Sequence, residues 1–181
     1  MKRFFRIFLV AAFAIASITS AKAQTKEFLE KFNEVKRLVE LPNSSAYKSI
    51  EIGQYPAEIL RVMGAELPAN ERNILNNIKV IYQVKIPLDI GNGRAAYNWF
   101  IGLTTGKQKT YESIMSQSGQ DKDISIYKAT KTKSSQPEEY LIMYRNKTKV
   151  MVCDIVGYLK LGDVINMLSP ELKDTLGIPN K

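Results

Sequence analysis

Histidine is absent from the 181-residue sequence, and this limits the chemistry that its side chains can perform. Histidine is the commonest general base at neutral pH and the commonest metal ligand. Ser-His-Asp and Cys-His catalysis are therefore excluded. An enzyme with this sequence would have to use carboxylates, lysine, tyrosine or an ion held by oxygen ligands.

Asp154 is the carboxylate with the most unusual sequence environment, because it interrupts the most apolar segment, residues 149–159. A buried carboxylate requires hydrogen-bonding partners or a raised pKa, and such groups often mark functional sites. Alternatively, Asp154 lies on an exposed face of the strand or caps a neighbouring backbone group. The sequence leaves both interpretations open.

Two further pairs of acidic residues, Asp121 with Asp123 and Glu138 with Glu139, fall at the expected ends of β-hairpins. A calcium site requires roughly six to eight oxygen ligands and a glycine-bearing loop, which neither pair supplies. The turn at residues 91–93 (Gly-Asn-Gly) lacks the third glycine and the βαβ unit of a dinucleotide-binding fingerprint. We therefore expect no metal ion and no cofactor, and assign no catalytic residue.

Cys153 is the only cysteine, so the chain cannot form an internal disulfide bond. Its apolar neighbours predict a buried position in a strand, where a free thiol behaves as a small hydrophobic side chain. An intermolecular disulfide or a reactive thiol is the alternative.

The first 23 residues have the features of a secretory signal peptide. Three basic residues precede an apolar run over residues 7–16, and residues 21–23 (Ala-Lys-Ala) fit a signal peptidase site. The run is too short to span a bilayer, which needs about 20 apolar residues. No cysteine lies just after the run, so we expect no lipid anchor. The sequence predicts cleavage before Gln24, a single domain over residues 24–181, and a periplasmic or secreted location.

The charge of the chain does not indicate a nucleic-acid-binding protein. The formal net charge is +8, but four basic and no acidic residues lie in residues 1–23, which leaves +4 after cleavage. A charge of that size is ordinary for a soluble protein. The basic segments 128–133 and 145–149 flank opposite ends of one expected strand, about 23 Å apart at about 3.3 Å per residue. They cannot form one anion site within a subunit, and we expect no nucleic-acid partner.

Hydrophobic periodicity predicts an α+β fold. Apolar residues have helical spacing over residues 25–41, 57–64, 70–77, 94–104 and 162–168 and strand-like patterns over 47–52, 79–88, 111–117, 123–129, 139–145 and 149–159. In the clearest strand, Ile78, Val80 and Tyr82 are expected to share one face. The last strand is apolar on both faces and should be central. We predict a mostly antiparallel sheet of about six strands with helices packed on one face, ending in a four-strand meander and a short helix.

Several segments also follow the pattern of a known family. They are Ile-Leu-Arg-Val-Met (59–63), Tyr-Glu-Ser-Ile-Met (111–115), Tyr-Leu-Ile-Met-Tyr (140–144), Val-Met-Val-Cys-Asp-Ile-Val-Gly (150–157) and Leu-Gly-Asp-Val (161–164). Over most of residues 25–168 the chain resembles the small exported proteins of the domain of unknown function 4252 family, mainly from Gram-negative Bacteroidota. Gly157 and Asp163 are the most distinctive residues of this resemblance.

The resemblance implies a periplasmic or outer-surface location and no established activity. It also implies an envelope-regulatory or maintenance role, because such proteins are often encoded beside envelope-stress sigma-factor systems. The triplet Asp174-Thr175-Leu176 resembles the O-glycosylation acceptor of exported proteins in that phylum. A triplet this short arises readily by chance, and the sequence does not decide whether it is modified.

We therefore expect an exported soluble envelope protein that binds a protein or an envelope surface and is not an enzyme. The alternative is a histidine-independent enzyme of unrecognised type with a carboxylate centre, for which Asp154 is the candidate.

Overall fold

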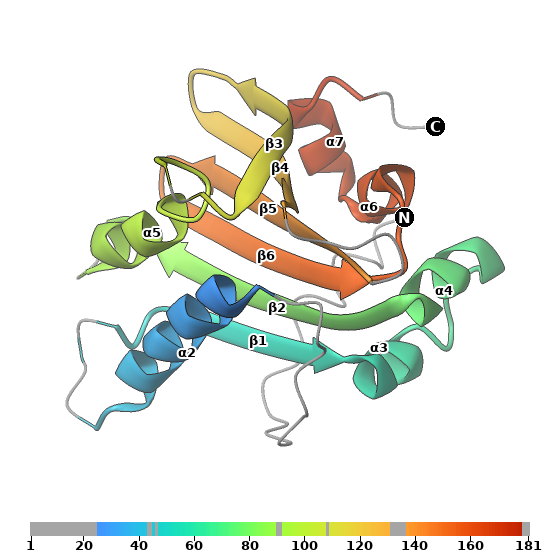
Figure 1. Cartoon of the computed structure of the whole chain (residues 1–181), viewed down its shortest axis with the longest axis horizontal. Helices are drawn as coiled ribbons and strands as arrows, with labels where there is room; N and C mark the ends of the chain where they lie inside the picture. Colours follow the sequence, from blue (N-terminus) through green and yellow to red (C-terminus); the bar gives the residue numbers. More distant parts are fainter. Residues whose placement is uncertain are drawn as a thin grey trace.

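Alternating apolar residues build one six-stranded antiparallel sheet (Figure 1). The computed structural model describes residues 25–42, 45, 47–89, 92–107, 109–130 and 137–178. The strands are β1 (Glu51–Pro56), β2 (Ile78–Pro87), β3 (Tyr111–Ser118), β4 (Lys122–Ala129), β5 (Glu138–Asn146) and β6 (Lys149–Gly157). They lie in the order β1-β2-β6-β5-β4-β3. The α+β class and the C-terminal four-strand meander are therefore as predicted.

Strand β6 lies between β2 and β5, in the central position that its apolar composition predicted. Its residues alternate between two hydrophobic cores, one on each face of the sheet. Val152 and Val156 face one core, and Cys153 and Ile155 face the other. A strand that is buried on both faces needs apolar residues at nearly every position, which explains its composition.

Helices cover both faces of the sheet, whereas the sequence analysis expected them on one. The α2-side core receives residues of α2 (Lys26–Glu40) and α5 (Gly93–Ile101), including Phe28, Phe32 and Phe100. The α6-side core receives residues of α3 (Ala57–Met63), α4 (Ala69–Asn76), α6 (Leu161–Met167) and α7 (Pro170–Thr175), including Leu60, Leu75, Val164 and Leu172. Because the central strands are apolar on both faces, each face must be covered.

Strand β2 departs from the expected alternation at its beginning. The pairing of β2 with β6 shifts in register between Ile78 and Val80, which is a β-bulge. Ile78 therefore belongs to the α6-side core, while Val80 and Tyr82 belong to the α2-side core. Strict alternation of side chains predicts that all three residues lie on one face of the sheet. This prediction is wrong for Ile78, because the bulge shifts the alternation by one residue.

The ends of the chain segments differ from the predicted ranges by a few residues, and most at β1. The expected strand over residues 47–52 is instead a turn followed by β1, in which Gln54 and Tyr55 pair with Tyr82 and Ile81. The chain continues after α6 into a short helix, α7. The hydroxyl of Ser169 accepts a hydrogen bond from the backbone N–H of Leu172 at 3.3 Å, so Ser169 is the N-cap of α7.

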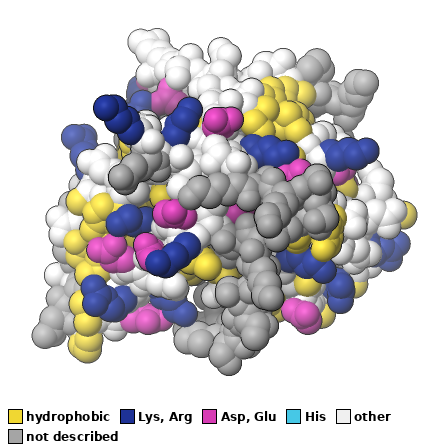
Figure 2. All heavy atoms as spheres, viewed as in Figure 1, with side chains coloured by type: hydrophobic (Ala, Val, Ile, Leu, Met, Phe, Trp, Pro, Cys, Tyr) yellow, Lys and Arg dark blue, Asp and Glu magenta, His cyan; other side chains and the backbone are white. Residues whose placement is uncertain are grey.

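Charged side chains of both signs are interspersed on the face shown in Figure 2. At the hairpin ends, Arg145 forms an ion pair with Asp123, and Lys147 forms one with Asp121. These ion pairs neutralise the charges of Arg145 and Lys147 in the basic segment 145–149. The other basic segment, 128–133, includes residues 131–133, which lie outside the described residues. Among the described helices, none is both long and apolar enough to cross a membrane. The predicted signal peptide also lies outside the described residues.

The two most distinctive residues of the family resemblance both have local structural roles. A Cβ atom at Gly157 would lie 2.5 Å from the carbonyl oxygen of Asn77 and 2.9 Å from Cα of Ile78, beside the bulge of β2. Asp163 accepts a hydrogen bond from the backbone N–H of Lys160 at 2.8 Å and so caps the beginning of α6. These positions therefore explain the geometry of the fold and do not indicate a site.

Replacing Gly157 by alanine should destabilise the protein, because the added methyl group would displace backbone atoms of β2. We expect Gly157→Ala to lower the free energy of unfolding by about 1–3 kcal/mol. Gly162→Ala is the matched control, since no atom lies within 4 Å of a Cβ at this helical position. It should raise stability by about 0.5–1 kcal/mol through helix propensity. Urea unfolding of the two variants measures both effects, and equal effects would contradict the close approach at Gly157.

Candidate functional site

Asp154 is fully buried, and it lies beside a second fully buried carboxylate, Glu139. Glu139 forms a hydrogen bond with Asp154 and accepts hydrogen bonds from Thr25, the N-cap of α2, and the hydroxyl of Tyr111 from β3 lies within hydrogen-bond distance of both carboxylates. The interpretation that Asp154 lies on an exposed face is therefore wrong, and the interpretation of a buried carboxylate with partners is correct. We call the group formed by Thr25, Tyr111, Glu139 and Asp154 the carboxylate cluster.

The pairing of β5 with β6 brings the two carboxylates together. Leu141 is opposite Asp154, and Glu139 is opposite Val156, so Glu139 and Asp154 are diagonal neighbours across the two strands. Because side chains alternate along a strand, Glu139 shares a face with Leu141, and Asp154 shares a face with Val156. Both carboxylates therefore belong to the α2-side of the sheet.

Tyr111 reaches the carboxylates from β3, which is two strands away from β5. Tyr111 is opposite Ala129 on β4, and the neighbouring pair Lys128 and Tyr140 places Ala129 opposite Glu139. The small side chain of Ala129 leaves room for the tyrosine ring to cross β4. The Tyr111 hydroxyl donates a hydrogen bond to Oε1 of Glu139 and lies 3.2 Å from Oδ1 of Asp154.

Thr25 joins the beginning of α2 to the same carboxylate. Its backbone N–H donates to Oε2 of Glu139 at 2.9 Å and to Oε1 at 3.1 Å, and its hydroxyl donates to Oε1 at 3.1 Å. A carboxylate at the N-terminus of a helix is favoured by the unpaired backbone N–H groups and by the helix dipole. Glu139 therefore fixes where the 15-residue helix α2 begins on the sheet.

Burial raises the pKa of the Glu139 carboxyl, and hydrogen bonds from Tyr111, Thr25 and Asp154 offset part of this rise. Burial also raises the pKa of the Tyr111 hydroxyl, and the two carboxylates raise it further. Tyr111 therefore stays protonated and acts as a donor. Two buried carboxyl groups in contact repel each other when both are ionised, so their titrations are coupled.

The carboxylate cluster has the chemistry of an acid–base pair, but its oxygens are occupied by hydrogen bonds within the fold. Glu139, Asp154 and Tyr111 do not line the cavity beside α4, the one at the hairpin ends or the one beside α7. A general acid or base must come within hydrogen-bond reach of the proton that it transfers. The described geometry therefore supports a structural role for the cluster.

The cavity between α4 and the C-terminal helices has an unusual lining. This cleft, which we call the asparagine cleft, has a volume of about 490 Å³. Its lining includes Asn70, Asn73 and Asn77 of the α4 segment and Asn166 of α6, with Ile74 and Met167 as apolar neighbours. Figure 1 shows α4 and α6 at the same end of the sheet. The volume of the cleft lies within the range of small-molecule pockets, although its lining is more polar than is usual for them.

The spacing of the asparagines places them on one face of α4, since residues i, i+3 and i+7 of a helix lie along one side. Asn77 follows the last residue of α4 as its C-cap, a position where asparagine is common. Asn70 and Asn73 have no such local reason, because asparagine lowers helix stability by up to about 0.7 kcal/mol relative to alanine. Their side chains are exposed to the cleft and available for a partner.

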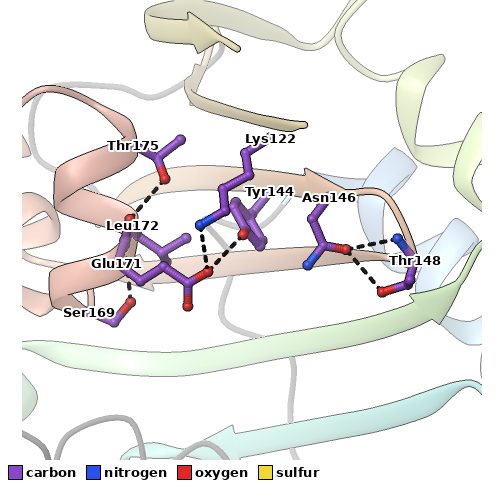
Figure 3. A network of polar contacts seen from close by, with 8 residues as sticks. All are labelled: Lys122, Tyr144, Asn146, Thr148, Ser169, Glu171, Leu172 and Thr175. Atoms are coloured by element: carbon purple, nitrogen blue, oxygen red, sulfur yellow. Dashed lines mark hydrogen bonds and ion pairs between the residues drawn. The ribbon is translucent and has the colours of Figure 1, made fainter. Parts of the chain in front are cut away.

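Two further cavities lie at the hairpin ends and beside α7. One is lined by Arg94, Tyr97, Asp121 and Arg145 among others, so both signs of charge meet there. The other is lined by Gln117, Glu171 and Thr175 among others. Figure 3 shows that Glu171 of α7 accepts hydrogen bonds from Lys122 and Tyr144, each at 3.1 Å, which hold α7 against β4 and β5. Lys122 and Glu171 therefore have a structural role, which is to hold α7 in place.

The acidic pairs of the sequence analysis separate in the structure. Glu138 pairs with Lys128 at 2.8 Å, whereas its neighbour Glu139 is buried in the carboxylate cluster. Asp121 and Asp123 form the ion pairs with Lys147 and Arg145. Within the described part of the chain, no group of three or more acidic or cysteine side chains is placed to hold a metal ion.

Cys153 is buried in the α6-side core, as its neighbours predicted. Burial raises the pKa of its thiol, and the adjacent Asp154 raises it further. Because the thiolate is the reactive form, a thiol in this environment is unreactive.

The triplet Asp174-Thr175-Leu176 lies at the end of α7. The hydroxyl of Thr175 donates to the backbone carbonyl of Glu171 at 2.8 Å, and the threonine is half-buried. Within the described fold, its hydroxyl takes part in the helix.

Sequence analysis identified Asp154 as unusual but missed Glu139, which it treated as one of a pair of hairpin acids. The signal that could have identified Glu139 is its position in the strand. Glu139 lies two and four residues before Leu141 and Met143, so all three side chains lie on the same face of β5. Because that strand is apolar on both faces, this spacing alone predicts a buried position for Glu139 in the α2-side core.

The chain matches no protein-family model, no curated protein and no solved structure in comparisons of its sequence and fold. The site must therefore be interpreted from its own geometry.

Glu139 should make the protein less stable as the pH rises. Its pKa is raised in the folded state, so its contribution to stability is present at low pH and lost as the pH rises through the folded pKa. Glu139→Gln keeps an acceptor for Thr25 and removes this ionisation. The stability of the variant relative to wild type should therefore increase between pH 4 and pH 8 in urea unfolding.

Glu171→Gln is the control with the opposite sign. The hydrogen bond from Lys122 lowers the pKa of Glu171, so its contribution is present at neutral pH and lost as the pH falls through the folded pKa. The stability of Glu171→Gln relative to wild type should therefore decrease between pH 4 and pH 8. Parallel pH profiles for the two variants would contradict the assigned burial of Glu139.

A thiol reagent should label Cys153 slowly in the native protein and rapidly in urea, because the folded core excludes the reagent and suppresses the thiolate. Cys153→Ala should lower stability by about 1 kcal/mol through lost packing. Labelling rates followed by mass spectrometry test the first statement. Rapid labelling of the folded protein would make Cys153 a candidate functional residue.

Proposed function

We propose that this chain is an exported, non-enzymatic envelope protein that binds a protein partner through the asparagine cleft. The observation that carries the non-enzymatic part is the complete burial of Glu139 and Asp154. In a chain without histidine, these are the carboxylates best suited to acid–base chemistry, and Glu139 binds the N-cap residue of α2, Thr25. Their capacity to form hydrogen bonds therefore serves to stabilise the fold.

The envelope location rests on the sequence. The signal-peptide pattern of residues 1–23 and the resemblance to the domain of unknown function 4252 family both support export. The lone buried cysteine is compatible with either redox compartment, and the proposal does not depend on it.

The asparagine cleft is the surface best suited to binding. An amide side chain carries both donors and an acceptor, so Asn70, Asn73 and Asn166 can pair with the backbone groups of an extended peptide segment. Ile74 and Met167 supply apolar contact area between them. Glu71, Asp163 and Lys173 also line the cleft, so both signs of charge are present with one acidic group in excess.

A photo-crosslinking amino acid at position 73 tests this proposal in living cells. We expect it to capture one defined envelope protein, because Asn73 lies in the cleft and is exposed. The same amino acid at position 33 is the matched control, since Asn33 is an exposed helical asparagine of α2 outside the cleft. Asn166→Arg should abolish the adduct formed at position 73, because the long cationic side chain would fill the cleft.

Adducts that form equally at positions 73 and 33, or that persist in Asn166→Arg, would contradict binding in the cleft. The enzyme alternative predicts a different result. A hydrolase or transferase activity found by substrate screening and abolished by Asp154→Asn, in a variant that still folds, would replace the proposed function. Cytosolic protein with an intact Met1 would contradict the proposed location.

A further inference from the structure

A polar cavity lies between α5 and the hairpin ends of the sheet, and the proposed function does not use it. This cavity, which we call the hairpin cavity, has a volume of about 490 Å³. Residues 94, 97 and 98 of α5 line one side, and the turns that connect β3 to β4 and β5 to β6 line the other. Figure 1 shows α5 beside the end of the sheet at which β5 connects to β6. The volume lies within the range of small-ligand sites, which is about 300–1,000 Å³.

The amphipathic pattern of α5 explains why polar side chains line this cavity. Ala96 and Phe100 are buried in the α2-side core. Arg94 and Asn98 are exposed and lie one turn apart, so they are neighbours on the polar side of the helix. Tyr97 lies at the border between the two sides. It is half-buried, packs against the α2-side core and also lines the cavity.

Positive charges outnumber negative charges in the lining of the hairpin cavity. The lining holds four cationic and two anionic side chains, which are Arg94, Lys122, Arg145, Lys147, Asp121 and Asp123. Three of these cations form ion pairs, with Asp121, Asp123 and Glu171 of α7 as their partners. Among the described residues, Arg94 is the cation of this lining that forms no ion pair, and the first turn of α5 holds no acidic side chain. Arg94 therefore supplies a positive charge that a ligand can neutralise.

The groups around Arg94 define the ligand more closely. A guanidinium group binds a carboxylate or a phosphate through two parallel N–H bonds. Asn98 and Gln120 are exposed amides in the same lining, and each carries donors and an acceptor, as the hydroxyl groups of a sugar require. Burial raises the pKa of the Tyr97 hydroxyl, and the positive charge of Arg145 offsets part of this rise. The Tyr97 hydroxyl therefore stays protonated, and its ring adds apolar contact area.

We propose that the hairpin cavity binds a sugar that carries a carboxylate or a phosphate group. Arg94 binds the anionic group, Asn98 and Gln120 bind hydroxyl groups, and Tyr97 contacts the ring. This inference goes beyond the proposed function, because the hairpin cavity shares no lining residue with the asparagine cleft. Each site can fail its own test without affecting the other.

Titration of the purified protein with four probes tests the ligand class. The probes are glucuronic acid, glucose 6-phosphate, glucose and inorganic phosphate. We expect at least one of the two anionic sugars to bind about tenfold more tightly than glucose and than phosphate, because it alone engages both the charged and the amide groups. Isothermal titration calorimetry gives the affinities, and backbone NMR shifts show whether α5 and the hairpin ends are the residues that respond.

Two substitutions separate the anionic and sugar parts of the site. Arg94→Gln should weaken binding of the anionic sugar about tenfold or more, through loss of the charge-assisted hydrogen bonds. Asn98→Ala should weaken binding of the anionic sugar and leave binding of inorganic phosphate unchanged. Arg61→Gln is the matched control, since Arg61 is an exposed helical arginine of α3 outside the hairpin cavity, and it should change neither affinity. Because Arg94, Asn98 and Arg61 are exposed, urea unfolding of all three variants should match that of wild type.

The probe that binds also distinguishes the two ligand chemistries. Binding of glucuronic acid alone assigns a carboxylate-bearing sugar, and binding of glucose 6-phosphate alone assigns a phosphorylated one. Absence of saturable binding by both would overturn the inference, as would an affinity for glucose or for inorganic phosphate equal to that for the anionic sugars. An affinity that Arg94→Gln does not change, or NMR shifts confined to other parts of the protein, would also overturn it.

Discussion

The hydrogen bonds between Glu139 and the backbone of Thr25 connect two parts of the fold that are far apart in sequence. Helix α2 packs its aromatic side chains against Tyr82, with the Phe32 and Tyr82 rings 4.7 Å apart and nearly perpendicular. Hydrophobic packing of this kind is not directional, so it allows a helix to slide or rotate over a sheet. A buried carboxylate that must be satisfied removes this freedom, because only one position of α2 presents a backbone N–H to it.

This arrangement has an energetic cost that a purely apolar core would avoid. Burying an ionisable carboxyl group costs several kcal/mol unless hydrogen bonds replace its water, and burying two in contact costs more. Tyr111, Thr25 and the carboxyl pair supply these hydrogen bonds to one another. The cluster thus contributes mainly to the uniqueness of the packing. It adds less to total stability than an equal area of apolar contact would.

Much of this fold was predictable because its strands are long and strongly patterned. The central position of β6 and the buried state of Cys153 followed from apolar residues on both faces of residues 149–159. The same observation, applied to β5, would have predicted helices on both faces and a buried Glu139. The bulge at Ile78 and the path of Tyr111 over Ala129 were not predictable. Both depend on how neighbouring strands are aligned with each other. A single sequence shows the apolar pattern of each strand, but it does not show which residues of two strands lie opposite each other.

The candidate sites themselves show the same division between local and long-range information. The asparagines of α4 stand out in the sequence once the helix is known, because their spacing is local. Asn166 lines the same cleft from α6, and this can be recognised only from the structure, in which α6 lies beside α4. The cleft borders the α6-side core, whereas the carboxylate cluster lies on the α2 side of the sheet. Since sites on opposite faces share no partners, substitutions in one should change stability or binding independently of the other. The sheet therefore separates the polar groups that specify the fold from those that are available to a partner.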